Sequence, residues 1–169
     1  MLLSTEIEKF MDRQRGNLVD GLNTCMFAEV VKVDLKHMRV DVKLPLPDDP
    51  YVYQVPICPH QTGEFVIRPP YRDGDRVLIV FSQQDIDPIL FAGGEPSKRQ
   101  HVIDDATIIG GVTPFTEPLP AGFDAHEEDF VIAKRDFSAK IIIQKNNEIL
   151  IESTNEVHVE GSRINLNCR

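Results

Sequence analysis

An apolar–x–apolar triplet recurs near the end of this 169-residue chain, and its regularity limits the folds that the segment can adopt. The interval is eight residues twice and then seven, for the triplets Ile141/Ile143, Ile149/Ile151, Val157/Val159 and Ile164/Leu166. Because successive side chains of a strand point to opposite faces, each triplet puts both apolar side chains on one side of a short strand. Turn-forming polar residues separate the triplets. Residues 130–169 are therefore predicted to form a small β-repeat with one apolar face.

The apolar face of such a repeat must be covered by a second layer of protein. Identical copies of the same segment around a symmetry axis are the simplest source of that layer. The repeat therefore predicts an intertwined homotrimeric shaft, a β-helix or β-prism, whose trimer core is formed by the residues of the triplets. The alternative is that the repeat forms the last sheet of an ordinary monomeric β-domain.

Charge and cysteine content argue against several classes of protein. The formal net charge of -9 disfavours a nucleic-acid partner, because binding of phosphates requires clustered lysine and arginine. Cysteines 25, 58 and 168 are odd in number and widely spaced, which suggests neither a disulfide framework nor a zinc finger. No apolar run has the length of a membrane span, and no export signal is recognisable, so we expect synthesis in a cytoplasm.

The first residues differ in pattern from the rest of the chain. Leu3, Ile7 and Phe10 fall at helical spacing, and Gly16 is a plausible stop. Residues 1–22 are therefore predicted to contain a short amphipathic helix. Its apolar stripe either folds back on the following domain or docks on a partner.

Residues 23–112 show the period of two that is typical of strands. The strongest strand, Arg76–Phe81, is apolar on both faces and belongs in the middle of a domain. Other strands are predicted at 24–33, 38–42, 51–57, 65–67 and 89–91. The fold class is thus all-β, and an OB-type Greek-key barrel is favoured over a two-sheet sandwich. Residues 113–129, rich in proline, glycine and acidic residues, are predicted to be a linker.

Three parts that follow the predicted N-terminal helix in this order carry, together with it, a family resemblance. They are the barrel strand within DGDRVLIVFSQQDID at 73–87, the segment Asp104-Asp105-Ala106 leading to Ile108-Ile109-Gly110-Gly111, and the repetitive β-tail. This arrangement resembles the central spike proteins of contractile phage tails, which have an N-terminal OB domain and a trimeric β-helical stem.

The resemblance implies a homotrimer in the tail baseplate of the virion, assembled in the host cytoplasm. Its OB domains and N-terminal helices would bind a tail hub protein, and its shaft would help puncture the host envelope. Several such spikes end in a His-x-His apex that binds a metal ion, whereas the five histidines here include no such pair. We therefore expect no bound metal or other cofactor, and a separate tip protein that caps the shaft.

Paired carboxylates are the residues that could suggest catalysis. Asp85/Asp87 and Asp104/Asp105 have the spacing of acid pairs, but nothing marks a cleft that would raise the pKa of one of them. We interpret them as solvated loop acids or strand-end caps. Because no nucleophile elbow, phosphate-binding loop or metalloprotease motif is present, we expect that the protein is not an enzyme.

Two single residues and one alternative function complete the predictions from the sequence. His158 faces away from the apolar row and is expected to meet solvent, and Cys168 is expected to lie in a frayed terminus. The alternative function is an OB-type binding module for oligosaccharide or single-stranded nucleic acid. Its exposed aromatic side chains would be Tyr51, Tyr53 and Phe65.

Overall fold

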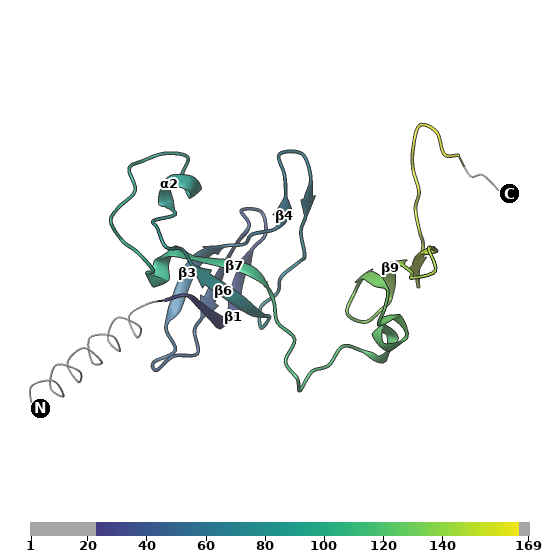
Figure 1. Cartoon of the computed structure of the whole chain (residues 1–169), viewed down its shortest axis with the longest axis horizontal. Helices are drawn as coiled ribbons and strands as arrows, with labels where there is room; N and C mark the ends of the chain where they lie inside the picture. Colours follow the sequence, from purple (N-terminus) through teal and green to yellow (C-terminus); the bar gives the residue numbers. More distant parts are fainter. Residues whose placement is uncertain (1–22, 166–169) are drawn as a thin grey trace, which may run out of the picture. The chain divides into compact units, whose positions relative to one another are not determined.

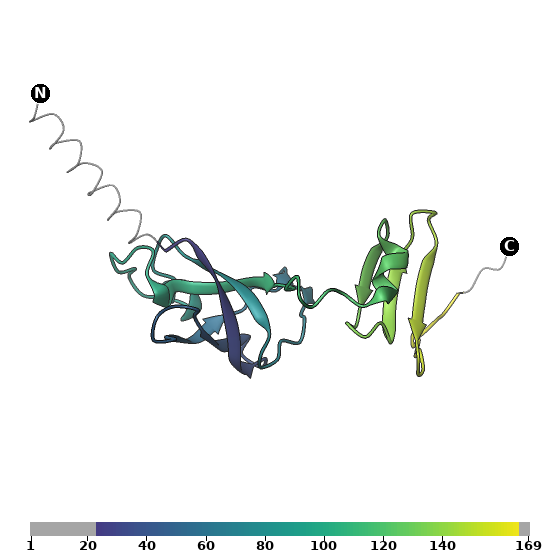
Figure 2. The ribbon, with the colours of Figure 1, turned by 90° about the horizontal axis from the view of Figure 1, so that it is seen from below.

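The computed structural model describes residues 23–165 and shows a mostly β chain, which confirms the all-β prediction (Figures 1 and 2). The chain divides into two compact units, Met1–Val112 (unit 1) and Thr113–Arg169 (unit 2). The helix predicted within residues 1–22 and the predicted core residue Leu166 lie outside the described residues.

Unit 1 is built on a five-stranded antiparallel sheet in the order β3-β2-β1-β6-β7 (Figure 1). The strands are β1 (Cys25–Asp34), β2 (Arg39–Lys43), β3 (Tyr51–Pro56), β6 (Arg76–Phe81) and β7 (Ala106–Gly111). A parallel bridge joins Ile57, just after β3, to Ile108 in β7, and the Cys58 N–H donates to the Ile108 carbonyl oxygen at 2.9 Å. The two edges of the sheet therefore meet.

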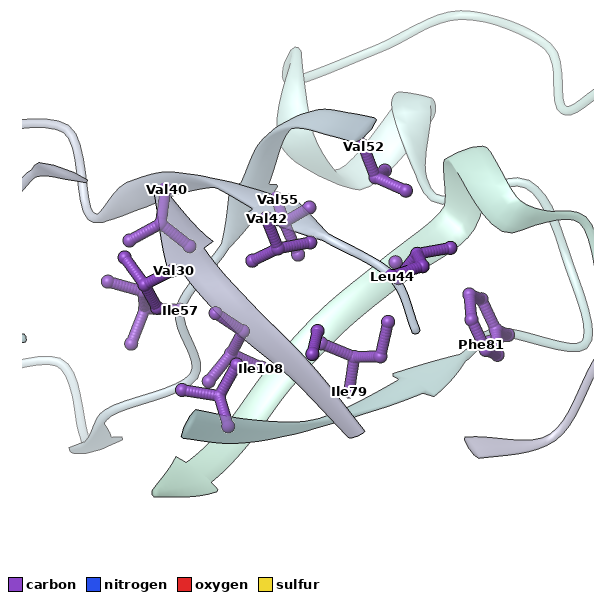
Figure 3. Close-up of a cluster of buried hydrophobic side chains, with 13 residues drawn as sticks. Val30, Val40, Val42, Leu44, Val52, Val55, Ile57, Ile79, Phe81 and Ile108 are labelled. Carbon is purple, nitrogen blue, oxygen red and sulfur yellow. The ribbon is translucent and has the colours of Figure 1, made fainter. Parts of the chain in front are cut away.

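Alternation along each strand produces the core of unit 1. In β6, Val77, Ile79 and Phe81 are buried, while the residues between them are partly exposed. The neighbouring strands contribute in the same way, and 13 buried side chains form one cluster (Figure 3). The fully buried members labelled there are Val30, Val40, Val42, Leu44, Val55, Ile79 and Ile108. Every strand of the sheet thus contributes side chains to one core.

Two elements of unit 1 differ from the prediction. Residues 89–91, predicted as a strand, lie in and just after the short helix α2 (Asp87–Leu90). Pro88 stands in the first turn of α2, where a helix does not use the missing N–H. The fifth strand of the sheet is instead β7, which follows the 3-10 helix η1 (Ile103–Asp105). In the sequence this strand is visible only as a brief apolar run.

A separate two-stranded ribbon interrupts the path between β3 and β6. It consists of β4 (His60–Gln61) and β5 (Val66–Ile67), and the turn residue Phe65 precedes β5. All four strand residues are exposed, as is Phe65. The predicted strand at 65–67 therefore exists, but it belongs to this ribbon and not to the main sheet.

Unit 2 contains a three-stranded antiparallel sheet in the order β10-β9-β8. Its strands are β8 (Phe130–Ala133), β9 (Ala139–Ile143) and β10 (Ile149–Ser153). The 3-10 helix η2 (Ala121–His126) lies within the stretch predicted to be a linker. Its Phe123 meets Phe137 edge to face, with 4.7 Å between the ring centroids.

The first two triplets lie in strands, and the later ones do not. Ile141/Ile143 belong to β9 and Ile149/Ile151 to β10, as the alternation predicts. Val157, Val159 and Ile164 lie in no strand of the described chain. A strand requires a hydrogen-bonded neighbour, and no described segment of the same chain pairs with these residues.

Substitution of Ile79 by alanine is expected to lower the free energy of unfolding of unit 1 by about 2–5 kcal/mol, because it leaves a cavity in a closed core. Ile89→Ala is the matched control, since the Ile89 side chain is 83% exposed. Urea unfolding followed by tyrosine fluorescence measures both variants, because the chain has no tryptophan and its tyrosines all precede residue 112. Equal effects of the two substitutions would contradict the assigned core.

Candidate functional site

Unit 2 exposes one whole face of its sheet. The strand register aligns two rows of large apolar side chains across three strands. One row is Phe130, Ile143 and Ile149, and the other is Ile132, Ile141 and Ile151. The exposed fraction of these side chains runs from 42% for Ile141 to 67% for Ile149. We call these six residues the apolar face, and a contiguous patch of this kind marks an interaction surface.

The opposite face of the same sheet is covered within the unit. Ile142 lies there between Val131 and Leu150, and it is fully buried. Lys140 Nζ lies 3.0 Å from Glu152 Oε2 and 4.7 Å from the centroid of the Phe137 ring. Unit 2 therefore satisfies one face of its sheet with its own side chains and leaves the other face in water.

The predicted trimer-core residues divide into three groups. Four lie together on the apolar face: Ile141, Ile143, Ile149 and Ile151. Three are half exposed outside any strand: Val157, Val159 and Ile164. Leu166 lies outside the described residues. Sequence reasoning missed Phe130 and Ile132 as members of the face, although their spacing of two residues is the same signal.

Three of the four paired acids gather around one arginine. Arg99 Nη2 lies 2.7 Å from Asp85 Oδ1, 2.8 Å from Asp87 Oδ2 and 2.8 Å from Asp105 Oδ1. Arg99 Nε also donates to Asp105 Oδ2, at 2.9 Å. The side chain of Asp105 is fully buried, whereas Asp104 is exposed. The prediction of solvated acids is thus wrong for Asp85 and Asp105, whose side chains are 6% and 0% exposed, but not for Asp87, whose side chain is 50% exposed. Asp85 also accepts the Asp87 N–H at 3.0 Å, as a loop cap does.

The cluster stabilises the ionised forms of Asp85 and Arg99, and it holds two segments of the chain together. The Ser97 backbone N–H lowers the pKa of Asp85, and Arg99 lowers it further. The pKa of Arg99 is in turn raised, chiefly by its hydrogen bond to Asp105. A general acid requires a raised pKa, which is the opposite of the shift at Asp85. The cluster instead ties the loop that carries α2 to the end of η1, where Ile86 N–H also donates to Asp105.

The histidines and cysteines considered in the sequence form no metal site among the described residues. Within residues 23–165, no group of three or more His, Cys, Asp or Glu side chains could hold a metal ion. Cys25 and Cys58 are free and exposed, and His158, also exposed, lies 2.9 Å from Glu156. Cys168 lies outside the described residues. No helix of the described chain has both the length and the apolar character to span a membrane.

Comparison with protein families gives a match to unit 1. A family model described as the phage protein Gp138 N-terminal domain matches residues 16–111, which is more than half of the 169 residues. The matched segment contains all five strands of the main sheet in unit 1. No curated protein matches the sequence.

Asp85→Asn is expected to destabilise unit 1 in a pH-dependent way. The pKa of Asp85 is lowered in the folded state from a reference value of 3.8. Its stabilising contribution is therefore complete above that reference value and is lost as the pH falls through the folded pKa. Urea midpoints of the wild type and the variant should differ at about pH 7 and should converge as the pH falls through the lowered pKa of Asp85 in the folded state.

Asp104→Asn is the control for this experiment, because Asp104 is exposed and lies outside the cluster. It should leave the urea midpoint unchanged at neutral pH. A difference between wild type and Asp85→Asn that stayed constant down to the lowest pH would show that the carboxylate charge of Asp85 is not what stabilises the loop.

Proposed function

Because the chain belongs to the phage protein Gp138 N-terminal domain family, we propose that it is a structural protein of the virion, the homotrimeric central spike of a contractile tail baseplate. The single observation that carries the proposal is the apolar face of unit 2. A spike requires a shaft of several intertwined chains, and this face requires a partner.

The topology of unit 1 supports an OB-type barrel as the attachment domain. Strands β1, β2 and β3 form a meander, and β6 returns to pair with β1 and carries β7 beside it. The parallel bridge from Ile57 to Ile108 closes the ring. Five strands in this order and with this closure correspond to a small Greek-key barrel. In the proposed spike, this barrel and the N-terminal helix bind the tail hub.

Burial of the apolar face supports the trimeric shaft. Three copies around an axis would remove three sets of the six side chains from water, and each fully buried large apolar side chain contributes about 1.5–3 kcal/mol. In the trimer, the residues that lie in no strand of the single chain would pair with strands of neighbouring copies. They are Val157, Val159 and Ile164, and Leu166 would extend the same apolar row. This pairing turns a one-layer sheet into a β-helix or β-prism.

The proposed spike works by transmitting force and not by catalysis. A baseplate spike punctures the host envelope when the tail contracts, so its task is to remain folded under load. A trimeric shaft meets this requirement because its strands are hydrogen-bonded between chains as well as within them. A separate tip protein at the C-terminal end and the host envelope are the further partners in this proposal.

The full chain is expected to be a trimer, with a mass in solution near three times the 19.1 kDa of one chain. A chain ending at Val112 should be monomeric, because it lacks the whole of unit 2. Multi-angle light scattering of the two proteins measures this directly. A monomeric full-length protein at micromolar concentration would rule out the spike.

Ile151→Asp is expected to prevent assembly, because symmetry would place three carboxylates in one apolar interior, where an unpaired charge costs several kcal/mol. Ile89→Asp makes the same chemical change at an exposed isoleucine of unit 1 and should leave the trimer intact. Light scattering again gives the readout. If both variants assembled as the wild type does, the apolar face would not be the subunit interface.

A further inference from the structure

A polar groove crosses the outer side of the barrel over β1, β2 and β3. Its volume is about 640 Å³, and its lining includes Lys32 of β1, Arg39 and Asp41 of β2, and Tyr53 and Gln54 of β3. Asp34 and His37 line its end, where the β1–β2 turn begins. The groove lies within unit 1, so it does not depend on how unit 2 assembles.

The backbone is irregular at the groove on each of the strands that form it. The register of β1 against β2 shifts between Val30 and Lys32, and that of β2 against β3 shifts between Val40 and Val42. Bulges of this kind redirect side chains and are common beside binding sites. Each of the two ladders, β1–β2 and β2–β3, thus has its one register shift at the groove.

Gln54 is held in a conformation that costs energy. Its φ is 55°, in the left-handed region that a residue with a Cβ seldom adopts. Asp41 Oδ1 accepts the Gln54 N–H at 2.8 Å, and Arg39 Nη1 donates to Gln54 Oε1 at 2.9 Å. Strain of this kind persists only where the surroundings fix it, and such positions cluster at binding sites. These two hydrogen bonds hold Gln54 in the groove that Tyr53 also lines.

The charges in the groove are nearly balanced. The register places Lys32 opposite Asp41 and Asp34 opposite Arg39 across the β1–β2 ladder. His37 Nδ1 also lies 2.7 Å from Asp34 Oδ2. A phosphate polymer would meet two carboxylates here on a chain with a net charge of -9, so a nucleic acid is disfavoured. A neutral ligand with many hydroxyl groups can use both signs of charge, because a hydroxyl both donates and accepts.

The exposed ring of Tyr53 supplies the aromatic surface of the groove. Tyr53 is 69% exposed, and its ring is stacked on that of Tyr51 with an angle of 16° between their planes. The C–H face of a sugar ring packs on such a flat surface, while its hydroxyls reach the neighbouring carboxylate, amide and guanidinium groups. We propose that this groove is a binding site for a neutral oligosaccharide, a function in addition to the structural role of the spike.

Isothermal titration calorimetry of the full chain tests the site with chitohexaose, cellohexaose and maltohexaose as probes. We expect saturable binding of at least one of them, with a dissociation constant below about 10 mM. Tyr53→Ala should weaken that binding roughly tenfold or more, because the stacking surface is lost, while Tyr53→Phe should retain most of it. Phe65→Ala is the matched control, since Phe65 is exposed to 75% but lies in the separate β4–β5 ribbon.

Further measurements distinguish a loss of sugar binding from a loss of the fold or of the oligomeric state. Tyr53 is a surface residue, so tyrosine fluorescence of the remaining residues and light scattering should show an unchanged fold and an unchanged oligomeric state. Failure of all three sugars to bind, or equal affinity of wild type and Tyr53→Ala, would overturn the proposal. Tighter binding of a dodecameric oligothymidylate than of any sugar would overturn it as well.

Discussion

Coverage of both faces of a β-sheet is the constraint on which this structure depends. Unit 1 meets it alone, because the bridge from Ile57 to Ile108 joins the edges of its sheet and encloses one core. The three strands of unit 2 are too few to close in this way. One of their faces is covered by side chains of the same unit, and the other remains bare. The same physical rule is therefore met within unit 1 and is left unmet on one face of unit 2.

Alternation in the sequence was sufficient to predict most of the strands. The positions of β1, β2, β3 and β6 follow from side chains that point alternately inward and outward, and the facing of Ile141 and Ile151 follows from the same period. Two errors have local causes. Residues 89–91 are apolar but stand just after Pro88, which favours a first helical turn. Strand β7 ends in Gly110-Gly111, and glycines reduce the strand signal.

The candidate sites depend on contacts that no local pattern reveals. Asp85 and Asp105 are separated in the sequence, and Arg99 stands in a polar stretch where nothing distinguishes it from a solvated side chain. Only the return of the chain through η1 brings the three together. The groove has the same origin, because it depends on two register shifts and on the φ of Gln54. Tyr51 and Tyr53 could be selected from the sequence as exposed aromatics, but their polar neighbours could not.

The family match and the proposed shaft concern different parts of the chain. A closed barrel with a core drawn from every strand fixes many positions at once, and the match to residues 16–111 covers it. A shaft that is buried between copies needs only apolar residues at alternate positions and corners that can turn, so many unrelated sequences satisfy it. The family model describes an N-terminal domain and covers the barrel, whereas the apolar face of unit 2 is recognised from the exposure of its side chains. The proposed mechanical role thus depends on the part of the chain that the family model does not cover, and it is argued from the exposed face alone.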